Sequence, residues 1–108
     1  MLEPILGNKT VEKILLFFER YGNGYAQDIA NTFNIPINGV QQQLKRLEDG
    51  GVLVSRFYGK VRLYEFNPRY PFLMELKDLL NRAFDYISRE ELKKYYMKRT
   101  RPRKPGKP

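Results

Sequence analysis

Apolar side chains recur at helical spacing near the start of the chain. They are Val11, Ile14, Leu15 and Phe18. Thr10 precedes them as a candidate N-terminal cap, and Gly22 follows them where a C-terminal cap is expected. The pattern therefore predicts a first helix over about 10–21.

A short second helix and a third helix follow in quick succession. After a glycine-rich turn, Tyr25 marks a short strand position, and the next residues predict a helix over 26–33. Asn34 tolerates the left-handed conformation needed to leave that helix, and Pro36 stands where its missing N–H costs a new helix nothing. A third helix is predicted over 37–49. Its inward-facing residues are Val40, Leu44 and Leu47.

The opposite face of the third helix is rich in amides. Its outward-facing residues are Asn38, Gln42, Lys45, Arg46 and Asp49, with Gln41 on the flank. Amide side chains can make paired hydrogen bonds to base edges, so this face is a candidate for reading DNA. A solvated helix surface is the alternative, and for any single glutamine it explains the residue equally well.

Two β-rich runs after Gly50-Gly51 predict a hairpin. VLVSRF covers 52–57 and VRLYEF covers 61–66. The basic residues of the hairpin, and the tyrosine between them, are Arg56, Tyr58, Lys60 and Arg62. They are candidate contacts for DNA phosphates or for a neighbouring minor groove. Ordinary edge-strand charges, which discourage aggregation, are the alternative.

A broad apolar stripe follows Pro71 and predicts one long helix. The apolar positions are Phe72, Leu73, Leu76, Leu79, Leu80, Ala83, Phe84 and Ile87. Such a stripe is wider than a small domain covers easily, so it predicts a helix shared with a second subunit. The apolar residues Leu2, Ile5 and Leu6 are expected to contribute to the same interface.

A capping-box pattern predicts one more helix, and the spacing of several aromatic residues fits a helical core. Ser88 and Glu91 form the box, which predicts a last helix over 89–98. The aromatic residues that fit helical core spacing are Phe17, Phe18, Phe33, Phe72 and Phe84. We interpret them as core packing rather than as platforms for stacking on bases.

Charge is distributed unevenly along the chain. The 108 residues include 20 Lys and Arg against 12 Asp and Glu, a formal net charge of +8. Residues 1–92 are balanced, and the excess lies in 93–108, which hold no acid. The segment TRPRKPGKP has no apolar side chain to bury, so a basic disordered tail over 99–108 is predicted after one domain over 1–98. The candidate DNA contacts in the tail are Arg99, Arg101, Arg103 and Lys104.

Missing residue types narrow the function. The chain has no Cys and no His, which removes disulfides, thiolate nucleophiles, zinc sites and the commonest general base. We therefore expect no enzyme, no metal and no cofactor.

The longest apolar run is 14–18, and Glu3 and Pro4 stand where a signal peptide would have basic residues. These features predict a cytoplasmic protein with no membrane segment.

The order helix, helix, helix, hairpin is that of a winged helix-turn-helix. The stretch DIANTFNIPINGVQQQLKRLEDGGVLVSRFYGKVRLYEFNP resembles the core of prokaryotic winged-helix transcriptional regulators of the ArsR-like and MarR-like kind. The residues that carry the resemblance are Asp28-Ile29-Ala30, Ile35, LKRLEDGGVLV over 44–54 and the basic hairpin. The thiolate metal site of that family has no counterpart, because residues 25–27 contain no cysteine.

The resemblance implies a mainly α fold with a small β hairpin and extra C-terminal dimerisation helices. It implies a sequence-specific regulator that binds double-stranded DNA as a homodimer, with the third helix in the major groove and the wing on the backbone or in the minor groove. The base-reading candidates are Asn38, Gln41, Gln42 and Lys45. A winged-helix protein-interaction module without specific DNA binding is the alternative, since a fold does not decide a function.

Overall fold

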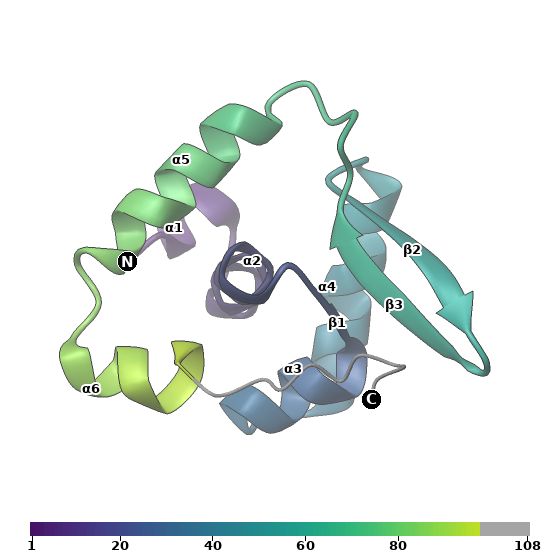
Figure 1. The fold of residues 1–108 in the computed structure, drawn as a ribbon, viewed down its shortest axis with the longest axis horizontal. Helices are drawn as coiled ribbons and strands as arrows, with labels where there is room; N and C mark the ends of the chain where they lie inside the picture. The colour runs from purple at the N-terminus through teal and green to yellow at the C-terminus, as the bar shows by residue number, and fades with distance from the viewer. Residues whose placement is uncertain (98–108) are drawn as a thin grey trace.

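Helix α2 (Lys9–Tyr21) runs through the middle of the molecule, and the other elements pack around it (Figure 1). The structure is a computed structural model that describes residues 1–97. The other elements before the hairpin are α1 (Glu3–Leu6), β1 (Asn23–Tyr25), α3 (Ala26–Phe33) and α4 (Ile37–Asp49). The later elements are β2 (Leu53–Tyr58), β3 (Val61–Phe66), α5 (Leu73–Phe84), α6 (Arg89–Glu91) and the π-helical turn η1 (Leu92–Tyr96). This order confirms the predicted winged helix-turn-helix.

Side chains and backbone cap both ends of α2. At the start, the side chain of Asn8 accepts a hydrogen bond of 2.9 Å from the N–H of Val11. The prediction that Thr10 is the cap is wrong, because Asn8 is the last extended residue and the helix already includes Thr10. Gly22 ends the helix as predicted. Its φ of 89° favours glycine, and its N–H donates to the carbonyl of Phe18 at 2.9 Å.

The turn between α3 and α4 has the conformation that its residues predict. Asn34 ends α3 in the left-handed region, with φ 55° and ψ 52°. Ile35 donates its N–H to the carbonyl of Ala30 at 3.0 Å and packs against the core. Pro36 then caps the N-terminus of α4. Local signals alone therefore place both helices of the helix-turn-helix at their predicted bounds.

The sheet has three antiparallel strands in the order β1-β3-β2. Strands β2 and β3 form the predicted hairpin, which starts at its base with Leu53 opposite Phe66. Strand β1 adds to the other edge of β3, with Tyr25 opposite Leu63, and this confirms the short strand predicted at Tyr25. Because β1 connects α2 to α3, the sheet ties the hairpin, or wing, to the helix-turn-helix.

The helix after Pro71 is shorter than predicted, because α5 ends at Phe84. The next two N–H groups each donate to the carbonyl three residues back at 3.0 Å, which tightens the last turn. The chain then changes direction, and the ring of Tyr96 comes to lie 5.2 Å from the ring of Phe84. The break thus lets the C-terminal segment fold back onto the core.

The last predicted helix begins as expected but does not stay α-helical. Ser88 caps α6, and its hydroxyl accepts a hydrogen bond of 3.1 Å from the N–H of Glu91. The chain then passes into η1, whose carbonyls receive donors from α2. Arg20 Nε donates to the carbonyl of Tyr96 at 2.6 Å, and the hydroxyl of Tyr21 donates to the carbonyl preceding it at 2.6 Å. These bonds fasten the C-terminal segment to the central helix.

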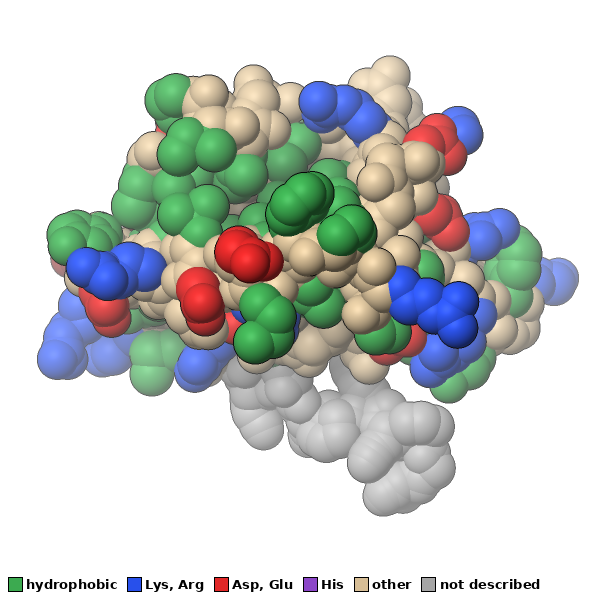
Figure 2. Space-filling view, turned by 90° about the horizontal axis from the view of Figure 1, so that it is seen from above, with side chains coloured by type: hydrophobic (Ala, Val, Ile, Leu, Met, Phe, Trp, Pro, Cys, Tyr) green, Lys and Arg blue, Asp and Glu red, His purple; other side chains and the backbone are tan. Residues whose placement is uncertain are grey.

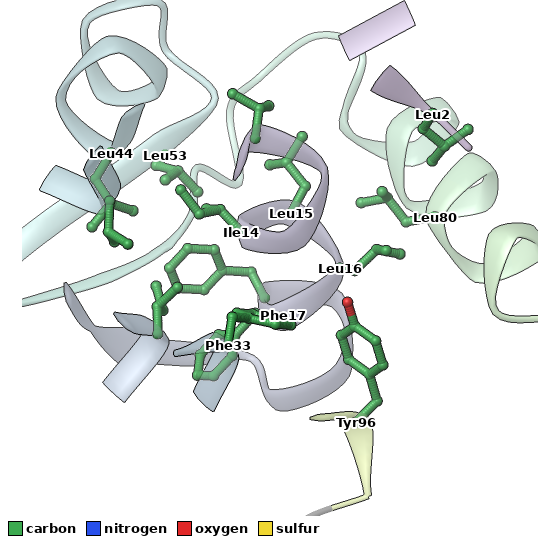
Figure 3. Close-up of a cluster of buried hydrophobic side chains, with 14 of the residues drawn as sticks. Leu2, Ile14, Leu15, Leu16, Phe17, Phe33, Leu44, Leu53, Leu80 and Tyr96 are labelled. Carbon is green, nitrogen blue, oxygen red and sulfur yellow. The ribbon is translucent and has the colours of Figure 1, made fainter. Parts of the chain in front are cut away.

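The hydrophobic core gathers around α2 (Figure 3). Residues 14–18 are all at most 5% exposed, and Phe33 lies 6.4 Å from Phe17 and 5.7 Å from Tyr96 between ring centroids. Packing was the wrong interpretation for Phe72, which precedes α5 and is 61% exposed. Among the ring pairs of the described residues, its ring contacts only Tyr70, edge to face. The other four aromatic residues contribute to the core as predicted.

The N-terminal residues form α1, a short helix that the sequence pattern did not predict. Leu2 is buried and Leu6 is half-buried against the core, so these two residues contribute to their own domain rather than to a subunit interface. Ile5 faces outward and is 69% exposed. Within residues 1–97, no helix is long and apolar enough to span a membrane.

Two glycine-to-alanine substitutions should change stability in opposite directions. A Cβ at Gly24 would lie 2.6 Å from the Phe17 ring, which is itself enclosed by the core, so Gly24→Ala should cost about 1–3 kcal/mol of unfolding free energy. A Cβ at Gly39 in α4 meets nothing within 4 Å, so Gly39→Ala should stabilise the protein by about 0.5–1 kcal/mol. Urea denaturation measures both. Equal effects of the two substitutions would contradict the close approach of β1 to α2.

Replacement of Tyr96 by Phe should leave the protein as stable as before or more stable. The hydroxyl of Tyr96 is buried and points toward Leu16 (Figure 3). It has no hydrogen-bond partner within residues 1–97, so its removal breaks no hydrogen bond to the described residues and leaves none of their polar groups unpaired. Burial raises the pKa of Tyr96. The unfolded chain therefore loses this proton first, and stability should fall as the pH rises above about 10. Tyr96→Phe should reduce that alkaline loss, measured by denaturation at several pH values, and an unchanged loss would contradict the burial.

Candidate nucleic-acid interface

The second helix of the helix-turn-helix, α4, presents a polar stripe to solvent. Val40 and Leu44 are fully buried and fix the inner face of the helix against the core. Asn38, Gln42 and Lys45, at spacings of four and three residues, are exposed and share the outer face. Three of the base-reading candidates are therefore brought together, as the sequence predicts.

The remaining two candidates on α4 lie on its flanks. Gln41 is exposed on the same side of the helix as Glu48, which lies two turns further along. Arg46 lies on the opposite side, where it donates to the side-chain oxygen of Gln43 at 3.0 Å. Its Nη2 also comes within 3.8 Å of the place that a Cβ on Gly7 would occupy. Arg46 thus borders the connection between α1 and α2, apart from the stripe.

Lys45 has an acidic neighbour one turn along the helix. Its Nζ lies 3.1 Å from Oδ2 of Asp49, and both side chains are largely exposed. An ion pair in full contact with water is weak, because solvent screens the attraction and both side chains lose freedom. Lys45 can therefore exchange Asp49 for another anion or for a hydrogen-bond acceptor at little cost.

The wing places its two arginines on opposite faces. Arg62 lies opposite Phe57 in the hairpin register, whereas Arg56 lies opposite Leu63 and projects from the other face. Arg56 pairs with Glu65 at 3.1 Å and lies 5.4 Å from the ring of Tyr58. The sequence pattern missed this ion pair, although an antiparallel register for the hairpin already brings residue 65 diagonally beside residue 56.

Arg62 belongs to a chain of hydrogen bonds that reaches α4. One guanidinium nitrogen, Nη1, donates to the hydroxyl of Ser55 at 2.9 Å, and that hydroxyl donates to Oε2 of Glu48 at 2.8 Å. The guanidinium also lies 4.1 Å from the centre of the Phe57 ring. Neither Glu48 nor Ser55 was singled out in the sequence analysis. The only signal was the short loop that brings the wing back to the end of the helix.

The tip of the wing is both basic and apolar. Phe57, Tyr58 and Val61 are 59%, 47% and 51% exposed, and Lys60 lies between them with no hydrogen bond or ion pair to any described residue. Figure 2 shows blue and green side chains side by side at this end of the molecule. The tip can therefore contact phosphates through its cations and a groove wall through its apolar atoms.

The remaining predicted contacts lie elsewhere in the chain. Arg99, Arg101, Arg103 and Lys104 fall outside the described residues. Among residues 1–97, no three or more carboxylates come together in a way that could hold a metal ion. The candidate interface on the described part of the chain consists of the α4 stripe and the wing.

Comparison with solved structures identifies the fold. The antimony-specific transcriptional repressor AntR has a TM-score of 0.63 with this chain, at 24% sequence identity over 79% of this chain and 75% of AntR. A MepR-like protein complexed with pseudoligands has a TM-score of 0.57 at 15% identity, covering 84% and 70% of the two chains. The adhesin competence repressor AdcR of Streptococcus pyogenes has a TM-score of 0.53 at 17% identity, covering 85% and 77%.

These likenesses confirm the winged-helix fold, and at such identities they establish the fold alone. No protein-family model matches the sequence, and no curated protein matches it. The function is therefore inferred from the residues of the interface.

Proposed function

We propose that this chain is a transcriptional regulator that binds double-stranded DNA in a sequence-specific manner. The observation that carries the proposal is the exposed stripe of Asn38, Gln42 and Lys45 on the second helix of a helix-turn-helix, beside a basic wing. AntR and AdcR, which are similar in fold, are named as repressors. In a prokaryote such a regulator meets its DNA in the cytoplasm.

In this proposal the α4 stripe reads bases in the major groove. Asn38, Gln41 and Gln42 can each hydrogen-bond adenine in a bidentate manner, and Lys45 can reach guanine. Each good bidentate pair contributes about 1–3 kcal/mol of discrimination against the wrong base. In this proposal sequence specificity therefore comes from four side chains that make no strong hydrogen bond or ion pair within the described residues.

The other candidate residues position the protein on the DNA backbone. They are Arg46, Arg56, Tyr58, Lys60, Arg62, Arg99, Arg101, Arg103 and Lys104. Phosphate contacts contribute affinity that falls with salt concentration but carry no sequence information of their own. Arg56 must leave Glu65 to make such a contact, while Lys60 is available without any rearrangement.

The proposed regulator is a homodimer that uses the end of the molecule away from the wing. Phe72, Met74 and Tyr86 are 61%, 73% and 71% exposed, and Ile5 of α1 is 69% exposed. Figure 2 shows hydrophobic side chains gathered at this end. Much of the predicted stripe is buried within its own domain, so these residues outside that core form the proposed interface. Two recognition helices would then read half-sites about 34 Å apart.

A protein-interaction module is the second candidate, and the same exposed apolar residues favour it. In that case the apolar end of α5 would bind a different protein, and the α4 stripe would be ordinary solvated surface. Selection of random duplexes by the purified protein separates the two functions. An enriched inverted repeat supports the regulator, and the absence of any enriched sequence supports the module.

A pair of substitutions should separate base reading from positioning. Gln42→Ala should weaken binding to the enriched duplex by about 1–3 kcal/mol and leave binding to random DNA nearly unchanged. Lys60→Ala should weaken both alike and flatten the plot of log affinity against log salt by about 0.9. Fluorescence anisotropy at several salt concentrations measures both effects. An unchanged ratio of specific to random affinity in Gln42→Ala would contradict the placement of the reading face.

The oligomeric state should depend on α5. Sedimentation at micromolar concentration should give twice the monomer mass of 12.9 kDa, and Met74→Glu should give the monomer, because it would bury a charge in the interface. Met97→Glu is the matched control, since Met97 is also exposed but lies outside α5, and it should remain dimeric. A monomer of the unaltered chain, with and without DNA, would contradict the proposal.

A further inference from the structure

The hairpin and the recognition helix are linked by a polar connection of three side chains. Glu48 lies in the last turn of α4, Ser55 lies in the middle of β2, and Arg62 lies opposite β2 on β3. The hydroxyl of Ser55 donates to Glu48 at 2.8 Å and accepts from Arg62 at 2.9 Å. One serine thus joins three secondary-structure elements.

This connection matters because little else holds the outer half of the wing. Leu53 is buried at the base of the hairpin and Leu63 is buried opposite Arg56, but every residue from 56 to 61 is exposed. An antiparallel pair that projects into solvent twists and bends readily unless side chains fix it to the body of the protein. Ser55 is the last side chain of β2 before the exposed tip, so its two hydrogen bonds act where the wing leaves the body.

The connection also fixes the direction of a cation. The guanidinium of Arg62 stacks on Phe57 at 4.1 Å, and this stack lies on the sheet face that Ser55 shares with α4. Glu48, Arg62 and Lys45 are the charged groups that act on Tyr64, and burial raises the pKa of Tyr64, so its phenol stays neutral at physiological pH. The Glu48 carboxylate is therefore occupied by the wing rather than directed at an approaching phosphate.

We infer that Ser55 and Glu48 are positioning residues of the DNA interface, which act through Arg62 to hold the wing at a fixed angle to the recognition helix. The inference rests on the proposed function. Ser55 need not touch DNA: it sets where the stacked Arg62 and Phe57 meet the groove beside the site read by α4. Loss of its hydroxyl frees the arginine from its fixed direction, and this weakens binding.

The test is a double-mutant cycle between Ser55 and Arg62 with the full chain. Ser55→Ala should weaken binding to the enriched duplex roughly tenfold, as expected for the loss of a hydrogen bond to a charged group, without changing the salt slope by a full phosphate contact. Ser55→Thr keeps the hydroxyl in a strand-compatible residue and should bind like the unaltered protein. In the Arg62→Ala background, Ser55→Ala should cause much less than its single-mutant loss.

A second measurement reports on the wing without DNA. Backbone amide order parameters for residues 57–61 should fall in Ser55→Ala and stay unchanged in Ser55→Thr. Thermal unfolding of each variant confirms that the domain remains folded. If Ser55→Ala binds and orders its wing like the unaltered chain, or loses the same affinity with and without Arg62, the inference is wrong. If the unaltered chain has no preferred duplex, the proposed function fails, and the order parameters still decide whether Ser55 holds the wing.

Discussion

The burial of α2 on all of its sides is the constraint on which the rest of the structure depends. A helix on the surface of a protein needs only one apolar stripe, but residues 14–18 are buried one after another. In a chain of this size, no single neighbour can cover such a helix. Elements from both halves of the sequence must therefore surround it: α3 and α4 on one side, α5 on another, and η1 across the end where Arg20 and Tyr21 hold its carbonyls.

This arrangement determines which surface is left for a ligand. Because Val40 and Leu44 are used to cover α2, the opposite face of α4 is committed to solvent, and its amides have no competing role in the core. The wing is a different case. It contributes Leu53 to the core at its base, and its outer half projects beyond the body, where affinity comes from exposed cations and apolar side chains. The reading surface is thus rigid, while the positioning surface depends on a few polar contacts.

Local signals in the sequence predicted the helix-turn-helix and the hairpin well, because Asn34, Pro36 and the paired glycines act on the backbone within a few residues. The errors arose where distant residues decide the outcome. Helix α5 ends at Phe84 because the chain must return for Tyr96 to reach the core, and the hydrophobic periodicity contains no sign of that return. The partners of Arg62 likewise depend on the angle between α4 and the wing, which the sequence pattern does not specify.

The close approach of Gly24 to Phe17 has a mechanical consequence. Gly24 of β1 lies against the Phe17 ring and pairs with Tyr64 of β3 in the sheet, so the wing strand β3 is joined to the aromatic core through β1. On the β1 side of this contact there is no side chain, so the Phe17 ring lies directly against the backbone. A shift of α2 along its axis would displace β3 almost directly, whereas the same shift reaches α4 through deformable leucine and valine side chains. We therefore expect the base of the wing to act as a stiff joint and the hairpin to bend only in the part beyond Ser55.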